Sequence, residues 1–296
     1  MITATEARSG KSHHDENFPV ASRLIRARHR APILAFYRFV RAADDIADHP
    51  GLAPDEKLRM LDAFEGALTG TGSPDPEAEP LRRVLAERGL SPRHAQDLLD
   101  AFRLDARKTR YADWSELMAY CTLSAMPVGR FVLDVHGEDP KTTWPASDAI
   151  CAALQVINHL QDCGKDFREL DRVYLPLDTL AAHSGGVGDL AAARASPGLK
   201  AAIVELAGRS LGLLKEGAAL PDLVADTRLA MEIAAIHRLA GKIAAGLRHR
   251  DPLSEKVHLS KPGFALSALA ASAATLIRRP FIAAPASRLA TGGRSR

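Results

Sequence analysis

Apolar residues recur every three to four positions through most of the chain, and the strict alternation typical of half-buried strands is nearly absent. The first strong pattern begins at Pro32, a residue type favoured in the first turn of a helix, and ends near Asp48, before His49-Pro50-Gly51. A second helix is expected after Pro54, and further helices are expected over 80–88, 92–108, 113–136, 145–166, 197–217, 221–249 and 263–279. The sequence therefore predicts an all-α protein.

Segments rich in glycine and proline separate these helices without dividing the chain into two halves. Gly70 to Pro80 is one such loop, and the helical pattern breaks again over 172–176. There is no internal repeat and no linker, so we predict a single helical domain over 16–285. Residues 1–15 are expected to form a disordered N-terminal tail, and residues 286–296 a basic C-terminal tail.

Composition limits the functions that the chain can have. Its 39 basic and 36 acidic residues give a net charge of +3, too small to indicate a nucleic-acid partner. Three scattered cysteines without a CxxC pair indicate a reducing compartment and exclude a cysteine-based zinc site. The polar start is unlike a secretory signal, and the longest weakly polar run, 264–277, is shorter than the roughly 20 residues of a spanning helix. We therefore expect a cytoplasmic protein that at most touches the inner face of the membrane.

A first acidic cluster lies near the end of the predicted 32–48 helix. Asp44 and Asp48 are four residues apart, so they share a helix face with their Cβ atoms roughly 5–6 Å apart. Like charges at this spacing destabilise a helix unless a cation lies between them, and carboxylate pairs are typical ligands of Mg²⁺. Arg41 lies on the same face and is a candidate phosphate ligand. Taken alone, the cluster is better explained as a solvated acidic helix end, because such acidic clusters are common.

A second cluster repeats this spacing on the predicted 145–166 helix. Asn158, Asp162 and Asp166 form one stripe on a helix that is otherwise mostly apolar, which suits the wall of a cavity better than a core. Aspartate pairs on two facing helices would hold a diphosphate between them through Mg²⁺, which neutralises the leaving group and promotes ionisation of the C–O bond. The alternative interpretation is a structural asparagine beside two surface aspartates.

Three sequence blocks resemble the squalene/phytoene synthase family. Phe36 to Asp48 is similar to its first aspartate motif, and Asn158 to Asp166, followed by Arg172-Val173-Tyr174-Leu175-Pro176, is similar to its second. Between them, Tyr120 to Gly129 is similar to the family's Tyr-Cys…Ala…Val-Gly helix. The resemblance covers roughly residues 16–180.

The resemblance implies an isoprenoid synthase fold, a single helical bundle around a central apolar cavity, and a Mg²⁺-dependent enzyme. The catalytic metal ligands would be Asp44, Asp48, Asp162 and Asp166, supported by Asp45 and Asn158. Diphosphate oxygens would bind Arg41 and Arg172. Aromatic rings would line the substrate cavity and stabilise carbocations, the candidates being Phe18, Phe36, Tyr37, Tyr120 and Phe131.

Within the family, two blocks resemble the bacterial branch that makes hydroxysqualene for hopanoid biosynthesis. These blocks are Glu16 to Ser22 and Ser124 to Arg130, although Met126 stands where this branch is expected to carry asparagine. Condensing members usually carry a base that grips a second diphosphate where this chain has Glu16. The resemblance thus favours a reaction on one diphosphate.

Gln161 and Leu123 point the same way, because condensing members often have arginine and tyrosine there. The favoured function is conversion of presqualene diphosphate to hydroxysqualene by ionisation, rearrangement and water capture. Two alternatives remain: a condensing enzyme that makes presqualene diphosphate or phytoene from two prenyl diphosphates, and a non-catalytic helical assembly protein.

Expected partners follow from these alternatives. The substrate would be a prenyl diphosphate, either presqualene or farnesyl diphosphate, and other enzymes of the squalene pathway are possible partners. No GxGxxG or GxxxxGK[ST] motif occurs, so we expect no nucleotide cofactor. The apolar segment 264–277, followed by Arg278, Arg279 and Arg288, is a candidate for peripheral membrane contact.

Overall fold

The computed structural model describes residues 24–279, and this part of the chain is helical without any strand. The predicted tails 1–15 and 286–296 lie outside the described residues. The α-helices are α1 (Ala27–Asp48), α2 (Pro54–Thr69), α3 (Glu79–Arg88), α4 (Arg93–Asp105), α5 (Trp114–Ser124), α6 (Met126–His136), α7 (Pro140–Leu170), α8 (Leu177–Ala182), α9 (Pro197–Gly217), α10 (Leu220–Leu223), α11 (Thr227–Leu247) and α12 (Lys261–Arg278). One 3-10 turn, Val187–Ala191, follows α8.

Two predicted helices are each divided in the structure. The predicted 113–136 helix is interrupted at Ala125, whose backbone leaves the helical region with φ −123° and ψ −47°. Pro127 explains the interruption, because proline lacks the amide hydrogen that would bond the Leu123 carbonyl in a continuous helix and its ring crowds that carbonyl. The predicted 221–249 helix is interrupted after α10, and α11 then begins at Thr227. It is capped by Asp226, whose carboxylate accepts hydrogen bonds from the amides of Arg228 and Leu229.

The central helix α7 is longer than the sequence pattern predicts. It begins at Pro140, five residues earlier than expected, with the Asp139 side chain accepting a hydrogen bond from the Lys141 amide. Pro145 is accommodated near the start of the helix. The helix ends where Asp171 adopts the left-handed conformation with φ 51°. The second aspartate motif, Asn158 to Asp166, therefore lies inside α7 and ends about one turn before the last residue of the helix.

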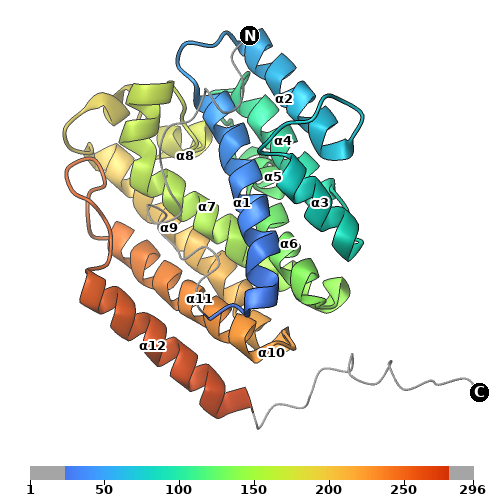
Figure 1. The fold of residues 1–296 in the computed structure, drawn as a ribbon. Helices are drawn as coiled ribbons and strands as arrows, with labels where there is room; N and C mark the ends of the chain where they lie inside the picture. Colours follow the sequence, from blue (N-terminus) through green and yellow to red (C-terminus); the bar gives the residue numbers. More distant parts are fainter. Residues whose placement is uncertain (1–23, 280–296) are drawn as a thin grey trace, which may run out of the picture.

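The helices pack around α7, which contacts α6 on one side and α9 on another. Figure 1 shows α7, α9, α11 and α12 in succession, with α12 at the edge of the bundle and α1 crossing in front of α6 and α7. Gly217 allows α9 to approach α7 closely, since a Cβ atom there would lie 2.4 Å from Ile150 Cγ1. No helix of the described region is both long and apolar enough to cross a membrane.

Candidate functional site

A cavity of about 490 Å³ lies among α1, α4, α5, α6, α7, α10 and α11. Most of its wall is apolar, with side chains such as Ile33, Phe36, Leu98 and Ile233. The polar and charged side chains that also line it are Tyr37, Arg41, Asp44, Ser124, Ser147, Gln155, Asn158 and Glu232. The cavity thus joins polar groups of both predicted motifs to a hydrocarbon-like chamber, and its presence agrees with the predicted bundle around an apolar centre.

The first motif occupies the last turns of α1. Arg41 donates from Nη1 to Asp44 Oδ2 at 2.7 Å and from Nη2 to Asp45 Oδ1 at 2.9 Å. Arg41 and Asp44 line the cavity, whereas Asp45 is buried. One guanidinium therefore holds two of the three acids of this motif at the cavity wall.

The surroundings of Asp44 destabilise its ionised form. Burial, reinforced by the neighbouring Asp48 charge, raises the pKa of Asp44 to about 7 even though Arg41 acts in the opposite direction. A cation bound at this point would favour the ionised form. The site therefore favours the binding of a further positive charge in addition to that of Arg41.

Arg172, predicted to bind diphosphate, is buried against the end of α1. Its Nη1 donates to Asp48 Oδ1 at 2.5 Å and its Nη2 donates to the Ala47 carbonyl oxygen at 3.1 Å. Lys57 Nζ donates to the same carbonyl at 2.7 Å. Arg172 thereby fastens the segment after α7 to the first motif and orients Asp48. A direct contact of Arg172 with diphosphate stays a prediction.

The second motif is more open than the first. Asn158 lines the cavity, whereas Asp162 and Asp166 lie further along α7 and do not belong to the cavity wall. Asp162 is exposed, and Asp166 is partly buried with its Oδ2 3.9 Å from His159 Nδ1. Only the first residue of the predicted Asn158–Asp162–Asp166 stripe therefore reaches the chamber.

Within residues 24–279, no group of three or more His, Cys, Asp and Glu side chains is arranged to hold a metal ion. The arginine contacts described above account for part of this, since Arg41 and Arg172 hold the acids of the first motif. The donor set still fits Mg²⁺, because all its members are hard oxygen ligands and Mg²⁺ commonly takes only one or two carboxylates plus phosphate oxygens. Substrate phosphates would thus supply the ligands that the two motifs do not supply together.

The predicted aromatic residues occupy different places. Phe36 and Tyr37 line the cavity, and Phe36 stacks on Phe131 with 4.0 Å between the ring centroids. Tyr120 does not line the cavity; its hydroxyl donates to Asp105 Oδ2 at 2.7 Å. Phe18 lies outside the described residues.

A buried network behind the cavity contains residues that sequence reasoning missed. Asp105 accepts hydrogen bonds from Tyr120 and, at 2.9 Å, from Tyr174, whose ring stacks on His159 at 3.6 Å between centroids. Burial raises the pKa of Asp105, while Arg172 and the two hydroxyls oppose this shift. The network joins α4, α5, α7 and the segment after α7. No spacing signal could have found Asp105, because its partners are distant in sequence.

Gln161 also acquires a role that the sequence did not reveal. Its Nε2 donates to the Val257 carbonyl oxygen at 2.7 Å, and the residue is buried. Its amide group thus ties α7 to the loop between α11 and α12. Gln161 is engaged in the fold, away from the polar part of the cavity wall.

Comparison with known proteins assigns the chain to a family. The family model described as squalene/phytoene synthase matches residues 11–262. The chain belongs to the squalene/phytoene synthase family. This membership and the all-α isoprenoid synthase fold confirm the corresponding predictions from sequence.

Individual members of the family are closely similar along the whole chain. The hydroxysqualene synthase of Rhodopseudomonas palustris is 54% identical over 97% of this chain and 98% of its own length. The hydroxysqualene synthase of Sinorhizobium fredii is 53% identical over 95% of this chain and 96% of its own. The crystal structure of squalene synthase HpnC from Alicyclobacillus acidocaldarius superposes with a TM-score of 0.70 at 34% identity, covering 79% of this chain and 89% of that one.

Proposed function

We propose that this protein converts presqualene diphosphate into hydroxysqualene. The observation that carries the proposal is the apolar cavity whose wall includes Arg41 and Asp44 from the first motif and Asn158 from the second. Such a chamber suits a long hydrocarbon with one anionic end. The relatives named hydroxysqualene synthase, with more than half of their aligned residues identical, support the choice of reaction.

Family members act on isoprenoid diphosphates and generally depend on a divalent metal. We infer that the metal here is Mg²⁺, held by oxygen ligands of the two motifs: Asp44, Asp45, Asp48, Asn158, Asp162 and Asp166. When bound, Mg²⁺ would supply positive charge that stabilises the departing diphosphate. Arg41 would add a guanidinium at the same end of the cavity, and Arg172 would keep Asp48 oriented.

The apolar wall would guide the cation that remains after diphosphate leaves. Phe36 and Tyr37 present aromatic rings to the cavity, and ring faces attract cations through their quadrupoles. Phe131 supports Phe36 from behind by stacking. Tyr120 and the Asp105 network would stiffen the wall without touching the substrate.

Product analysis separates this proposal from its alternatives. Purified protein is incubated with Mg²⁺ and either presqualene diphosphate or farnesyl diphosphate, with and without EDTA and with no nicotinamide cofactor. We expect a C30 alcohol from presqualene diphosphate only, and none in EDTA. Presqualene diphosphate or phytoene formed from shorter substrates would instead identify a condensing enzyme, and no turnover of any substrate would favour the assembly protein.

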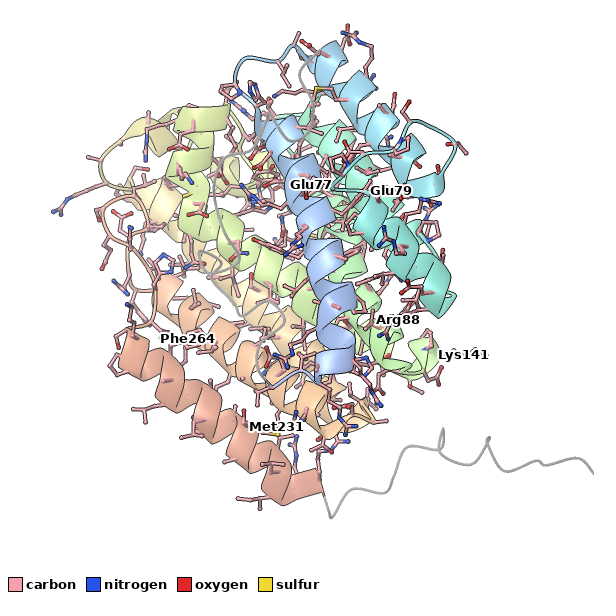
Figure 2. The ribbon with its side chains drawn as sticks, viewed as in Figure 1. Glu77, Glu79, Arg88, Lys141, Met231 and Phe264 are labelled. Atoms are coloured by element: carbon pink, nitrogen blue, oxygen red, sulfur yellow. The ribbon has the colours of Figure 1, made fainter. Side chains whose placement is uncertain are left out.

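We further propose that the outer face of α12 contacts a membrane surface. Its leucine and isoleucine side chains are unusually exposed: Leu266 is 68%, Leu269 68%, Leu276 48% and Ile277 70% exposed. Figure 2 shows the side chains of α12, where Phe264 is labelled, at the edge of the molecule. Substrate and product are long hydrocarbons, so a membrane is where both would partition.

Charge on α11 and α12 favours an anionic bilayer as the occupant of this face. Every exposed charged side chain of the two helices is basic, and their one acid, Glu232, is buried. The exposed bases are Arg228, Arg238, Lys242, Lys261 and Arg278. A symmetric dimer through this face would bring like charges together, whereas anionic lipid would attract them.

Arg278 and Arg279, which follow the apolar segment, also make contacts within the fold. Arg279 donates to the carbonyl oxygens of Pro221, Val224 and Ala225, at 2.8, 2.8 and 2.9 Å. Arg278 pairs with Asp222 at 2.6 Å. Arg279 therefore closes the end of α10, and truncation before it would disturb the fold together with any lipid contact.

The sharper test of membrane contact replaces apolar side chains on α12. Leu266→Gln/Leu269→Gln should lose co-sedimentation with vesicles of phosphatidylglycerol and phosphatidylcholine at low salt. Leu104→Gln, on α4 and 37% exposed, serves as the control and should still bind. Unchanged binding by the double variant would refute the α12 contact, and a change from dimer to monomer would identify a second copy as the occupant.

A further inference from the structure

One hydroxyl group in the cavity wall lacks the partner that similar hydroxyls have elsewhere in this protein. Ser124 is the last residue of α5 and lines the cavity. Its Oγ is buried, and no atom of residues 24–279 lies within hydrogen-bonding distance of it. By contrast, Ser210 donates to Leu206 O at 3.0 Å and Thr275 donates to Ala271 O at 3.0 Å, each bonding the carbonyl four residues back.

Buried polar atoms are nearly always hydrogen-bonded to protein or ordered water, because leaving them unsatisfied is costly. Ser124 is the last residue of α5, next to the interruption at Ala125, whereas Ser210 and Thr275 lie inside continuous helices. Its position at the cavity wall makes a molecule inside the cavity the available partner.

Contacts with α7 define the position of Ser124 along the axis of that helix. One turn before it, Tyr120 lies against His159, with 6.2 Å between ring centroids. Five residues after it, Gly129 packs so closely on α7 that a Cβ atom there would lie 2.6 Å from Cys151 Sγ. Along the axis of α7, Ser124 therefore lies between the positions of His159 and Cys151, at about the level of Gln155.

This level is next to the charged end of the cavity. Gln155 precedes Asn158 by three residues on α7, a rise of about 4.5 Å, and both side chains line the cavity. A hydroxyl here is placed beside the carbon chain close to its diphosphate end. That is where a cation formed by loss of diphosphate would begin.

We propose that Ser124 holds the water molecule that captures this cation, an inference that rests on the proposed function. In the reaction, the C–O bond to diphosphate breaks and the leaving group takes the electron pair. After rearrangement, a lone pair of the water oxygen forms the new C–O bond. The resulting oxonium ion gives one proton to the released diphosphate, leaving the neutral alcohol.

A serine hydroxyl suits this role because it both donates and accepts a hydrogen bond. Water in an apolar cavity needs two or more polar partners to remain there. The Gln155 side chain, whose Nε2 lies 3.0 Å from His159 Nε2, is a polar group of the cavity wall at the same level. Ser124 and Gln155 together would keep one water at the charged end of an otherwise apolar chamber.

A buried serine outside the cavity provides a matched control. Ser210 on α9 is buried, donates to the Leu206 carbonyl oxygen at 3.0 Å and does not line the cavity. Replacing Ser210 by alanine therefore removes a serine hydroxyl without removing one that faces the substrate. Ser210→Ala should leave the products unchanged.

The decisive comparison uses an isosteric pair, Ser124→Thr and Ser124→Val, which differ only in a hydroxyl and a methyl group. Each variant is incubated with presqualene diphosphate and Mg²⁺, and the ratio of alcohol to hydrocarbon products is measured together with substrate consumption. We expect Ser124→Val to lower this ratio about tenfold, as loss of a buried hydrogen bond would, while Ser124→Thr keeps it. In the valine variant the cation would lose a carbon-bound proton to diphosphate and form an olefin.

Product binding gives a readout that does not depend on turnover. Hydroxysqualene in detergent should bind Ser124→Val about tenfold more weakly than Ser124→Thr, with squalene binding equal in the two variants. An unchanged alcohol ratio and unchanged hydroxysqualene affinity in Ser124→Val, or equal losses in both variants, would overturn the proposal. Failure of the proposed function would look different, because the unmodified protein would then form no alcohol at all.

Discussion

The two aspartate motifs have the same spacing in sequence but different environments in the structure. On α1, Arg41 bonds Asp44 and Asp45, and Arg172 bonds Asp48, so the two arginines hold the acids in place and compensate part of their charge. On α7, Asn158 reaches the cavity while Asp162 is exposed to solvent. Equal i,i+4 spacing therefore does not imply that two motifs are equally organised before a ligand binds. Protein contacts hold the first motif in place, whereas bound ligand would complete the second.

Removing one carboxylate from each motif should have the largest effect. We expect Asp44→Asn and Asp162→Asn each to reduce turnover of presqualene diphosphate by at least about 10³-fold, since both would weaken charge stabilisation of the leaving group. Initial rates at saturating Mg²⁺ measure the loss, and circular dichroism checks the fold. Asp62→Asn, at an exposed position on α2 outside the cavity wall, is the control. Near-normal rates in either motif variant would remove that motif from the site.

Breaking the arginine contact of the first motif should mainly affect stability. Arg172→Met leaves Asp48, whose side chain is 35% exposed, without its buried partner, and this should lower the free energy of unfolding by about 2–3 kcal/mol. Arg209→Met, at a surface pair with Glu205 on α9, should cost less than about 1 kcal/mol. Urea denaturation compares them. Equal small losses would show that the motif does not depend on Arg172.

The pH dependence of stability should also differ between the motifs. In metal-free protein the pKa of Asp44 is raised from 3.8 to about 7, so its contribution is favourable at low pH and is lost as pH rises toward 7. Asp44→Asn should therefore be more stable than the unmodified protein at pH 8, by about 1–2 kcal/mol after allowing for partial exposure, but not at pH 4.

The same replacement at exposed Asp162 should change stability less. Urea denaturation in EDTA at the two pH values measures both variants. An Asp44→Asn effect of equal size at pH 4 and pH 8 would contradict the charge-based explanation.

Much of the fold followed from local sequence patterns. Apolar periodicity predicted the positions of α2, α3, α4 and α9 closely, because each buries one face and ends at glycine, proline or a polar turn. The predicted start of the first helix at Pro32 was wrong, since α1 begins at Ala27 and Pro32 lies inside it. The break at Ala125 was missed although Pro127 signals it, since the apolar pattern continues through both helices. Periodicity reports which face is buried, and it is less sensitive to a short interruption between two buried helices.

Prediction of the site was less complete because much of it depends on tertiary contacts. The i,i+4 pairs could be read from one helix at a time, and the structure brings Asp44 and Asn158 to one cavity. The partners of Asp105 and Arg172 come from segments 15 to 125 residues away, so no local pattern identifies them. Ser124 was noticed as part of a family block, but its buried, unpartnered hydroxyl is visible only in three dimensions.

Turnover in isotopically labelled water tests the central claim most directly. Protein, Mg²⁺ and presqualene diphosphate are combined in H₂¹⁸O without any reductant, and the products are identified by mass spectrometry. The account predicts hydroxysqualene carrying one ¹⁸O, because the C–O bond to diphosphate breaks and water forms the new one. Squalene, an alcohol without the label, or no consumption of presqualene diphosphate would contradict it.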